Sequence, residues 1–252
     1  MGDDARDSEV AQLMTRVLMR IAISILLVVG TAGVTLSLVQ TVQQADAETP
    51  WLWWASRSLG FVAYLSLTLS MIFGVLVSSR GADGLVARKT VLYLHQQWTL
   101  AAVISVLLHV AAIVVHSESH ISGIDAAVPF AASRLTGPVA LGTVAGWGIV
   151  LIALSSWFRK RISYVVWRAI HAFAFGSFFL AILHGITAGS DTGIAAQWFY
   201  LMSGSAVLAA VMFRVIFAIH GPSRHGRPRP ARPTGAASLS SHVPSAGTRT
   251  DG

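Results

Sequence analysis

Long apolar runs separated by short polar segments are the main pattern of this sequence. Six of these runs are about 20 residues or longer, which at about 1.5 Å of rise per residue lets a helix cross the roughly 30 Å of hydrocarbon in a bilayer. They cover residues 17–39, 52–78, 91–116, 138–158, 164–187 and 196–219. The pattern predicts an all-α integral membrane protein, a six-helix bundle whose single domain occupies residues 15–220.

The two ends of the chain have a different composition. Residues 1–14 are polar and mixed in charge, and residues 221–252 are rich in Pro, Gly, Ser and Arg. Neither end has enough large apolar side chains to bury a core, so we expect a disordered start and a disordered basic tail.

Basic residues gather in alternate loops between the predicted spans, which fixes an expected orientation. One set of loops contains Arg16, Arg20, Arg80, Arg88, Lys89, Arg159, Lys160 and Arg161. The other set holds mainly acidic residues, Asp46, Glu48, Glu118, Asp125 and Asp191. The positive-inside rule then predicts a multi-pass protein of the cell membrane with both termini in the cytoplasm. The net charge of +7 therefore gives no reason to expect a nucleic-acid partner.

Composition narrows the chemistry further. The chain is 54% hydrophobic and only 12% charged, compared with about 25% charged in soluble proteins. It contains no cysteine, which excludes disulfides, thiolate metal sites and covalent haem attachment through C-x-x-C-H. Any haem in this protein is expected to be b-type.

Four histidines lie inside the predicted spans, where ionisable residues are rare and usually functional. His95 and His109 are fourteen residues apart in the third span, and His171 and His184 are thirteen apart in the fifth. These spans are parallel because one hairpin separates them, and the intervals correspond to about 21 Å and about 20 Å along a helix. Imidazole is a common axial ligand of haem iron, so the pattern favours two b-type haems at two depths.

Other roles for these histidines are interhelical hydrogen bonding and ligation of a transported metal ion. A metal-ion transporter is expected to carry carboxylates or broken helices at the bilayer midplane, and the six spans contain no Asp or Glu. A purely structural membrane scaffold is the least favoured role, because helix packing does not require four buried imidazoles.

The directions in which the four histidines would point on ideal helices fit this arrangement less well. At about 100° per residue, His95 and His109 lie within about 40° of one face, whereas His171 and His184 lie about 140° apart. We expect tilt, side-chain reach and local rewinding near Gly176 and Ser177 to share this difference.

Two motifs in fixed order resemble a known family. They are H-x13-H in LHQQWTLAAVISVLLH and, one hairpin later, H-x12-H in HAFAFGSFFLAILH; the second span also contributes WASRSLGFVAYLSLTLSMIFGV. From about Trp51 to Leu201 the chain resembles the ferric-reductase-like transmembrane family. That family includes the haem core of ferric reductases and NADPH oxidases, and the haem subunit of the bacterial methionine sulfoxide reductase system.

The resemblance implies bis-histidine ligation, by His95 with His171 at an inner haem and by His109 with His184 at an outer haem. Electrons would enter from the cytoplasm and leave outside, with ferric chelate as the default acceptor. The alternative acceptor is a separate extracytoplasmic redox enzyme served by this chain as its haem subunit.

Two arginines are further cofactor-binding candidates. Arg57 matches an arginine that the oxidase branch keeps near its outer haem, where it would pair with a propionate or bind an acceptor; an interfacial anchor is the alternative. Arg168 lies near the inner level and would pair with propionates there, although topology alone also places a basic residue at this depth.

The departures from the family are informative too. Full-length members continue into flavin- and nicotinamide-binding domains, whereas the tail here has no glycine-rich phosphate loop. We therefore expect no flavin or nicotinamide site, and a separate donor, either a cytosolic flavoprotein reductase or a membrane quinol. Ile113 stands where the oxidase branch has a further histidine, so dedicated superoxide production is not expected.

Two weaker patterns remain. His116, Glu118 and His120 alternate in an outer loop and resemble a metal ligand set, but three spaced polar residues are a weak signal, and a solvated loop with incidental histidines is the favoured interpretation. Gly142 and Gly146 form a G-x-x-x-G pattern, typical of close helix approach.

Overall fold

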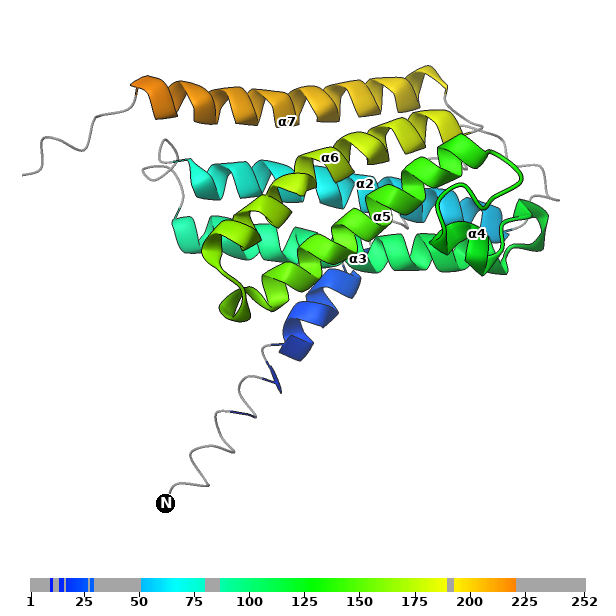
Figure 1. The fold of residues 1–252 in the computed structure, drawn as a ribbon, viewed down its shortest axis with the longest axis horizontal. Helices are drawn as coiled ribbons and strands as arrows, with labels where there is room; N and C mark the ends of the chain where they lie inside the picture. Colours follow the sequence, from blue (N-terminus) through cyan, green and yellow to red (C-terminus); the bar gives the residue numbers. More distant parts are fainter. Residues whose placement is uncertain are drawn as a thin grey trace, which may run out of the picture.

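The computed structural model describes residues 10, 14–15, 17–26, 28–29, 51–79, 87–189 and 193–220. These residues are helical or lie in turns, and none is in a strand. Five helices are long and apolar enough to cross a membrane: α2 (Trp51–Ser78), α3 (Arg88–Val115), α5 (Thr136–Trp157), α6 (Tyr164–Ala188) and α7 (Ile194–His220). Figure 1 shows their arrangement. Short helices lie between them: η2 (Ser117–Ser119), α4 (Gly123–Ala127) and η3 (Arg159–Arg161).

The prediction of spans is confirmed for the second to the sixth, whose ends differ from the expected ones by at most three residues. The first predicted span is described only in part, as an apolar helix from Val17 to Leu26, and residues 30–50 lie outside the described residues. A six-helix bundle therefore stays a prediction. The disorder predicted for 1–14 and 221–252 falls almost entirely outside the described residues.

Helix starts follow local rules. Ser163 precedes α6, and its hydroxyl accepts a hydrogen bond from the backbone N–H of Val166 at 3.3 Å, as an N-cap does. Pro138 lies in the first turn of α5, where a missing backbone N–H costs nothing because the first helical N–H groups have no partner within the helix.

The bundle is built from two helical hairpins and one additional helix. α2 packs closely along α3, and α5 packs closely along α6, while contacts between the two hairpins are far sparser. α7 lies mainly against α2. In Figure 1 the α5–α6 hairpin is inclined to α2, α3 and α7. The space between the hairpins is where the four predicted histidines lie.

Aromatic side chains connect α2, α6 and α7 at mid-length. The Tyr64 ring stacks on Phe178, with centroids 5.6 Å apart and planes at 11°, and meets Tyr200 edge-on at 4.9 Å. The Tyr64 hydroxyl is 2.8 Å from the Ser203 hydroxyl of α7. In a bilayer, such packing and interhelical hydrogen bonds hold helices together, because lipid tails remove the hydrophobic driving force.

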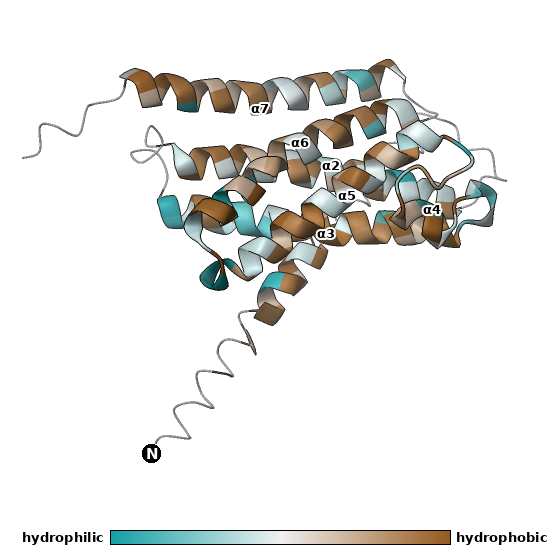
Figure 2. Ribbon diagram, viewed as in Figure 1, coloured by the Kyte–Doolittle hydropathy of each residue, from teal (hydrophilic) through white to brown (hydrophobic). Residues whose placement is uncertain are grey.

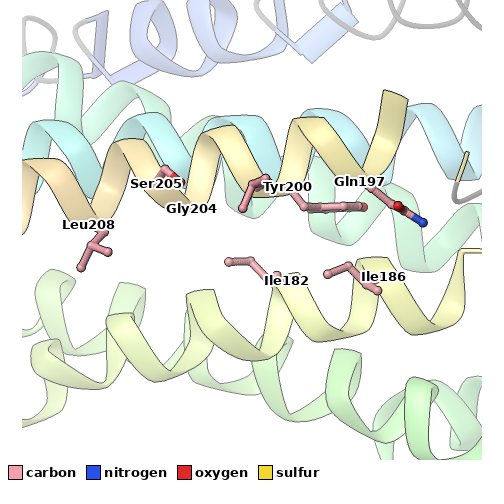
Figure 3. Close-up of a pocket in the computed structure, with 8 residues that line it drawn as sticks. Ile182, Ile186, Gln197, Tyr200, Gly204, Ser205 and Leu208 are labelled. Carbon is pink, nitrogen blue, oxygen red and sulfur yellow. The ribbon is translucent and has the colours of Figure 1, made fainter. Parts of the chain in front are cut away.

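The groove between α6 and α7 is apolar and about 370 Å³ in volume (Figure 3). Its lining residues include Ile182 and Ile186 of α6 and Tyr200 and Leu208 of α7. At Gly185 the two helices come close, since the Tyr200 hydroxyl occupies the space that a Cβ would need. α7 is thus held to α6 at this point and is separated from it along the groove.

Surface and interior are distributed as in a membrane protein. Many large apolar side chains are exposed, for example Leu107, Leu151, Phe173 and Met202. Hydrophobic residues predominate along the long helices (Figure 2). Polar side chains are buried between helices, namely Ser56, Ser58, Ser66, Thr68, Ser70, Gln97 and Ser105. Exposed apolar side chains together with buried polar ones fit lipid as the surrounding solvent.

The segment between α3 and α5 contains a short helix that the sequence did not predict. Ser122 and Asp125 form a capping box that starts α4, and the Ser122 backbone N–H donates to the Asp125 carboxylate at 2.8 Å. These hydrogen bonds, from the Ser122 N–H and then from its hydroxyl, hold the pKa of Asp125 below its ordinary value. α4 is tied to α5 because the Trp147 indole N–H donates to the Ala127 carbonyl at 2.8 Å.

A candidate two-level histidine site

The four intramembrane histidines meet across the hairpins in two pairs. His95 of α3 and His171 of α6 have ring centroids 6.1 Å apart with planes at 74°. His109 and His184 have centroids 6.4 Å apart with planes at 79°. The structure thus brings together the two pairs that the resemblance implied, and all four side chains are half-buried.

The spacing within each pair distinguishes a hydrogen bond from a bridging metal ion. Two imidazoles joined by a direct N–H···N bond of about 2.9 Å have ring centres about 5.2 Å apart. With a metal ion about 2.0 Å from each nitrogen, the centres are about 6.3 Å apart. The observed 6.1 and 6.4 Å fit the second geometry. The residues present therefore fit bis-histidine ligation of a haem iron at each level.

Hydrogen bonds at the other ring nitrogen support the same interpretation. Nδ1 lies 2.6 Å from the Ser56 carbonyl oxygen in His109 and 2.8 Å from the Pro138 carbonyl oxygen in His184. A carbonyl oxygen only accepts, so each Nδ1 carries the hydrogen and the Nε2 of each neutral ring is a bare acceptor. Two Nε2 atoms that both lack a hydrogen cannot hydrogen-bond to one another. A metal ion satisfies both, and metal-ligating histidines usually donate their other N–H in this way.

The inner ligand of α3 is held similarly. His95 Nδ1 lies 2.9 Å from the Ser70 carbonyl oxygen and 3.2 Å from the Ser70 hydroxyl. The Ser70 hydroxyl is also 2.6 Å from that of Thr99, which in turn donates to the His95 carbonyl at 2.7 Å. Ser70 thus orients the His95 ring at Nδ1, and Thr99 holds the Ser70 hydroxyl in place.

Three glycines make room for three of these rings. A Cβ added to Gly60 would lie 3.1 Å from His109 ring atoms, one added to Gly74 would lie 3.1 Å from His95, and one added to Gly142 would lie 2.6 Å from His184. Each ring therefore occupies a glycine notch, defined here as the space above one of these three glycines.

Each notch has the same sequence register. The glycine follows, by four residues, the residue whose carbonyl accepts the histidine N–H: Ser56 with Gly60, Ser70 with Gly74 and Pro138 with Gly142. Residues four apart lie one above the other on a helix face, so a ring that rests on the glycine reaches this carbonyl. Of the three notch glycines, only Gly142 was singled out from the sequence, as part of a G-x-x-x-G pattern typical of close approach. A close approach is present at Gly142, where the His184 ring lies against the glycine. Nothing lies within 4 Å of a Cβ added at Gly146, the other glycine of the pattern.

The signal for the other two notches was present but weak. S-x-x-x-G occurs twice in the second span, yet serine and glycine are common in membrane helices, and nothing in the spacing connects them to a histidine one helix later.

His171 and His184 both meet rings of α3, although an ideal helix places them about 140° apart. α6 continues as a helix through Gly176 and Ser177, and the α5–α6 hairpin is inclined to α3 (Figure 1), which agrees with the tilt expected from the sequence. The shares of side-chain reach and local rewinding stay a prediction.

The two arginines lie near the two levels and contact aromatic rings. The Arg57 guanidinium lies 4.9 Å from the centre of the Trp53 ring. Arg168 is exposed, lies 5.6 Å from the Tyr164 ring centre, and donates to the Tyr164 hydroxyl at 3.3 Å. A role of either arginine toward a haem propionate stays a prediction.

The structure does not gather the alternating outer residues into a metal site. His116 is 6% exposed and packs against the Trp53 ring at 6.1 Å, whereas Glu118 and His120 are exposed. In the part of the chain that the structure describes, no three His, Asp or Glu side chains lie together as ligands. This arrangement favours the interpretation of a loop with incidental histidines.

The described part of the chain is all-helical, with five helices long and apolar enough to span a membrane, and its two hairpins meet through paired histidines at two levels. A scan of the sequence against protein-family models and a search of curated proteins both find no match to this chain. The resemblance to the ferric-reductase-like family therefore stays a prediction.

Proposed function

We propose that this protein is a transmembrane di-haem b-type cytochrome that carries electrons from a donor on the cytoplasmic side to an external acceptor. The observation that carries this proposal is the geometry of the outer pair. His109 and His184 each commit Nδ1–H to a carbonyl, and their ring centres are 6.4 Å apart, a spacing that suits an intervening iron and is too wide for a hydrogen bond.

His95 with His171 would hold the inner haem, and His109 with His184 the outer one. Bound haem iron supplies reversible one-electron oxidation and reduction. The chain's residues would set the conditions for that chemistry. Backbone carbonyls fix the tautomer and ring plane of three ligands, and the apolar helices exclude water and ions from the path.

The separation of the two haem levels suits electron transfer across the membrane. About 20 Å separates the levels along α3 and along α6, which is most of the hydrocarbon thickness. We propose a cytosolic flavoprotein reductase or a membrane quinol as the donor and a ferric chelate as the acceptor, with an extracytoplasmic redox protein as the alternative acceptor.

The first experiment is spectroscopic. Purified protein is expected to show a reduced-minus-oxidised b-type spectrum and two haems per chain by pyridine haemochrome assay. His109→Ala is expected to lose about one haem, while His120→Ala, at an exposed outer position, keeps both. Protein that contains no haem, or a His109→Ala variant that retains two, would refute the proposal.

The acceptor is tested with dithionite-reduced protein. Rapid reoxidation by ferric chelates supports a ferric reductase, and reoxidation only by a co-purifying external redox protein supports the alternative acceptor.

A further inference from the structure

His171 differs from the other three histidines of the site. Its Nδ1 is buried and, in the described part of the chain, has no hydrogen-bond partner. Ser177 lies over Gly148 and Trp167 meets Ser156, so His171 lies opposite the stretch of α5 between these two residues. There is no glycine from residue 149 to residue 175, so α5 offers no notch at this depth.

An indole ring covers one face of the His171 imidazole. Trp167 lies one helical turn before His171 on α6, and the two rings stack with centroids 5.0 Å apart and planes at 24°. The Trp167 indole N–H points to the Ser156 hydroxyl of α5 at 3.4 Å. Trp167 is therefore held from the opposite helix of the hairpin, and it presents a flat surface to the ligand ring.

A cation completes the stack. The Arg159 guanidinium lies 4.7 Å from the centre of the Trp167 ring, and its charge also acts on His171. A cation over an indole is a favourable contact that keeps both groups in place. Arg159, Trp167 and His171 thus form a continuous stack between η3 and the inner level of the site.

We infer that Trp167 is the positioning residue for His171 and that it replaces the backbone carbonyl that orients each of the other three ligands. This inference rests on the proposed function, since it concerns the fourth axial ligand of the two haems. A hydrogen bond from Nδ1 to a carbonyl makes a ligating imidazole more basic, whereas a stacked indole fixes the ring plane without that effect. Side-chain contacts near the cytoplasmic end of α6 therefore control the orientation of one ligand of the inner haem.

The test compares four forms of the haem-loaded protein. Trp167→Leu removes the stack, Trp167→Phe keeps an aromatic face, and Trp157→Leu is the matched control, because Trp157 ends the neighbouring helix and is 83% exposed. The readouts are the two midpoint potentials from a redox titration and the ferric EPR signals, which report the angle between axial rings. The inner haem is assigned as the one retained in His109→Ala.

Trp167→Leu is expected to shift the potential and the EPR signal of the inner haem alone, because the His171 ring is free to leave its 74° angle to His95. A tenfold change in the relative binding of oxidised and reduced haem corresponds to about 59 mV. Trp167→Phe is expected to stay close to wild type, and Trp157→Leu to be unchanged. If Trp167→Leu leaves both haem signals as in wild type, or shifts the outer one equally, the inference is wrong.

Arg159→Gln provides a second test that does not depend on the folding of the leucine variant. Removing a positive charge near His171 disfavours the reduced state, so the inner potential is expected to fall while the outer one stays constant. No change at the inner haem would contradict the stack as described. Wild-type protein without haem would instead refute the proposed function, so the two failures are distinguishable.

Discussion

Replacing Gly142 by alanine gives the sharpest test of the site, since a single methyl group would collide with one ligand. The added Cβ would lie 2.6 Å from Nδ1 and Cε1 of His184, whereas ordinary contacts begin at 3.4 Å. The ring must therefore retreat by about 0.8 Å, the difference between these distances. That movement lengthens the 2.8 Å bond to the Pro138 carbonyl to as much as about 3.6 Å, beyond hydrogen-bonding range.

The expected cost follows from two independent estimates. Overpacking a filled site costs about 1–3 kcal/mol, and losing an outer partner of a metal-bound histidine lowers metal affinity about 10–100-fold, which is about 1.4–2.7 kcal/mol. Both estimates predict that Gly142→Ala loses much of its outer haem during purification. The measurement is the number of haems per chain by pyridine haemochrome, with the reduced-minus-oxidised spectrum.

The chain offers graded comparisons and a matched control. Gly60→Ala and Gly74→Ala bring the new Cβ to 3.1 Å from the ring, so a shift of a few tenths of an ångström relieves each and the haem loss is expected to be smaller. Gly146→Ala lies one turn along the same helix with nothing within 4 Å, and it is expected to keep both haems. A Gly142→Ala protein with two haems and a wild-type spectrum would refute the reasoning.

Two further predictions concern stability. Tyr64→Phe keeps the aromatic stack but loses the hydrogen bond to Ser203. Thermal unfolding in detergent is expected to show that the free energy of unfolding falls by about 0.6 kcal/mol, a typical value for a hydrogen bond between membrane helices. An unchanged midpoint would mean that the bond contributes nothing. Because the pKa of Asp125 is depressed in the folded chain, the capping box stabilises α4 above the pKa of the unfolded state, and this stabilisation is lost as the pH falls through the folded-state pKa. Asp125→Asn is expected to cause the same loss of helix stability at neutral pH. The measurement is amide hydrogen exchange in Gly123–Ala127, corrected for intrinsic rates, which is expected to be faster in the variant. Equal exchange in both proteins would contradict the prediction.

Much of the architecture could be predicted from the order of residues alone. Five spans lie within three residues of their expected ends, because apolar length is enough to specify a helix that must satisfy its own backbone in lipid. The depth of the histidines was predictable for the same reason, since rise per residue converts sequence separation directly into height. Both properties belong to single helices, so neither depends on how the helices pack.

Contacts between helices were decided only by the tertiary structure. Ser56, Ser70 and Pro138 serve the site through backbone carbonyls, which every residue possesses, so no side-chain pattern marks them. The inclination of the α5–α6 hairpin to α3 was not predictable either, because a crossing angle is a property of two packed surfaces. The exceptional support of His171 depends likewise on the stretch of α5 opposite it, which contains no glycine after Gly148. Sequence spacing sets the height of each ring, and the neighbouring helix sets its orientation.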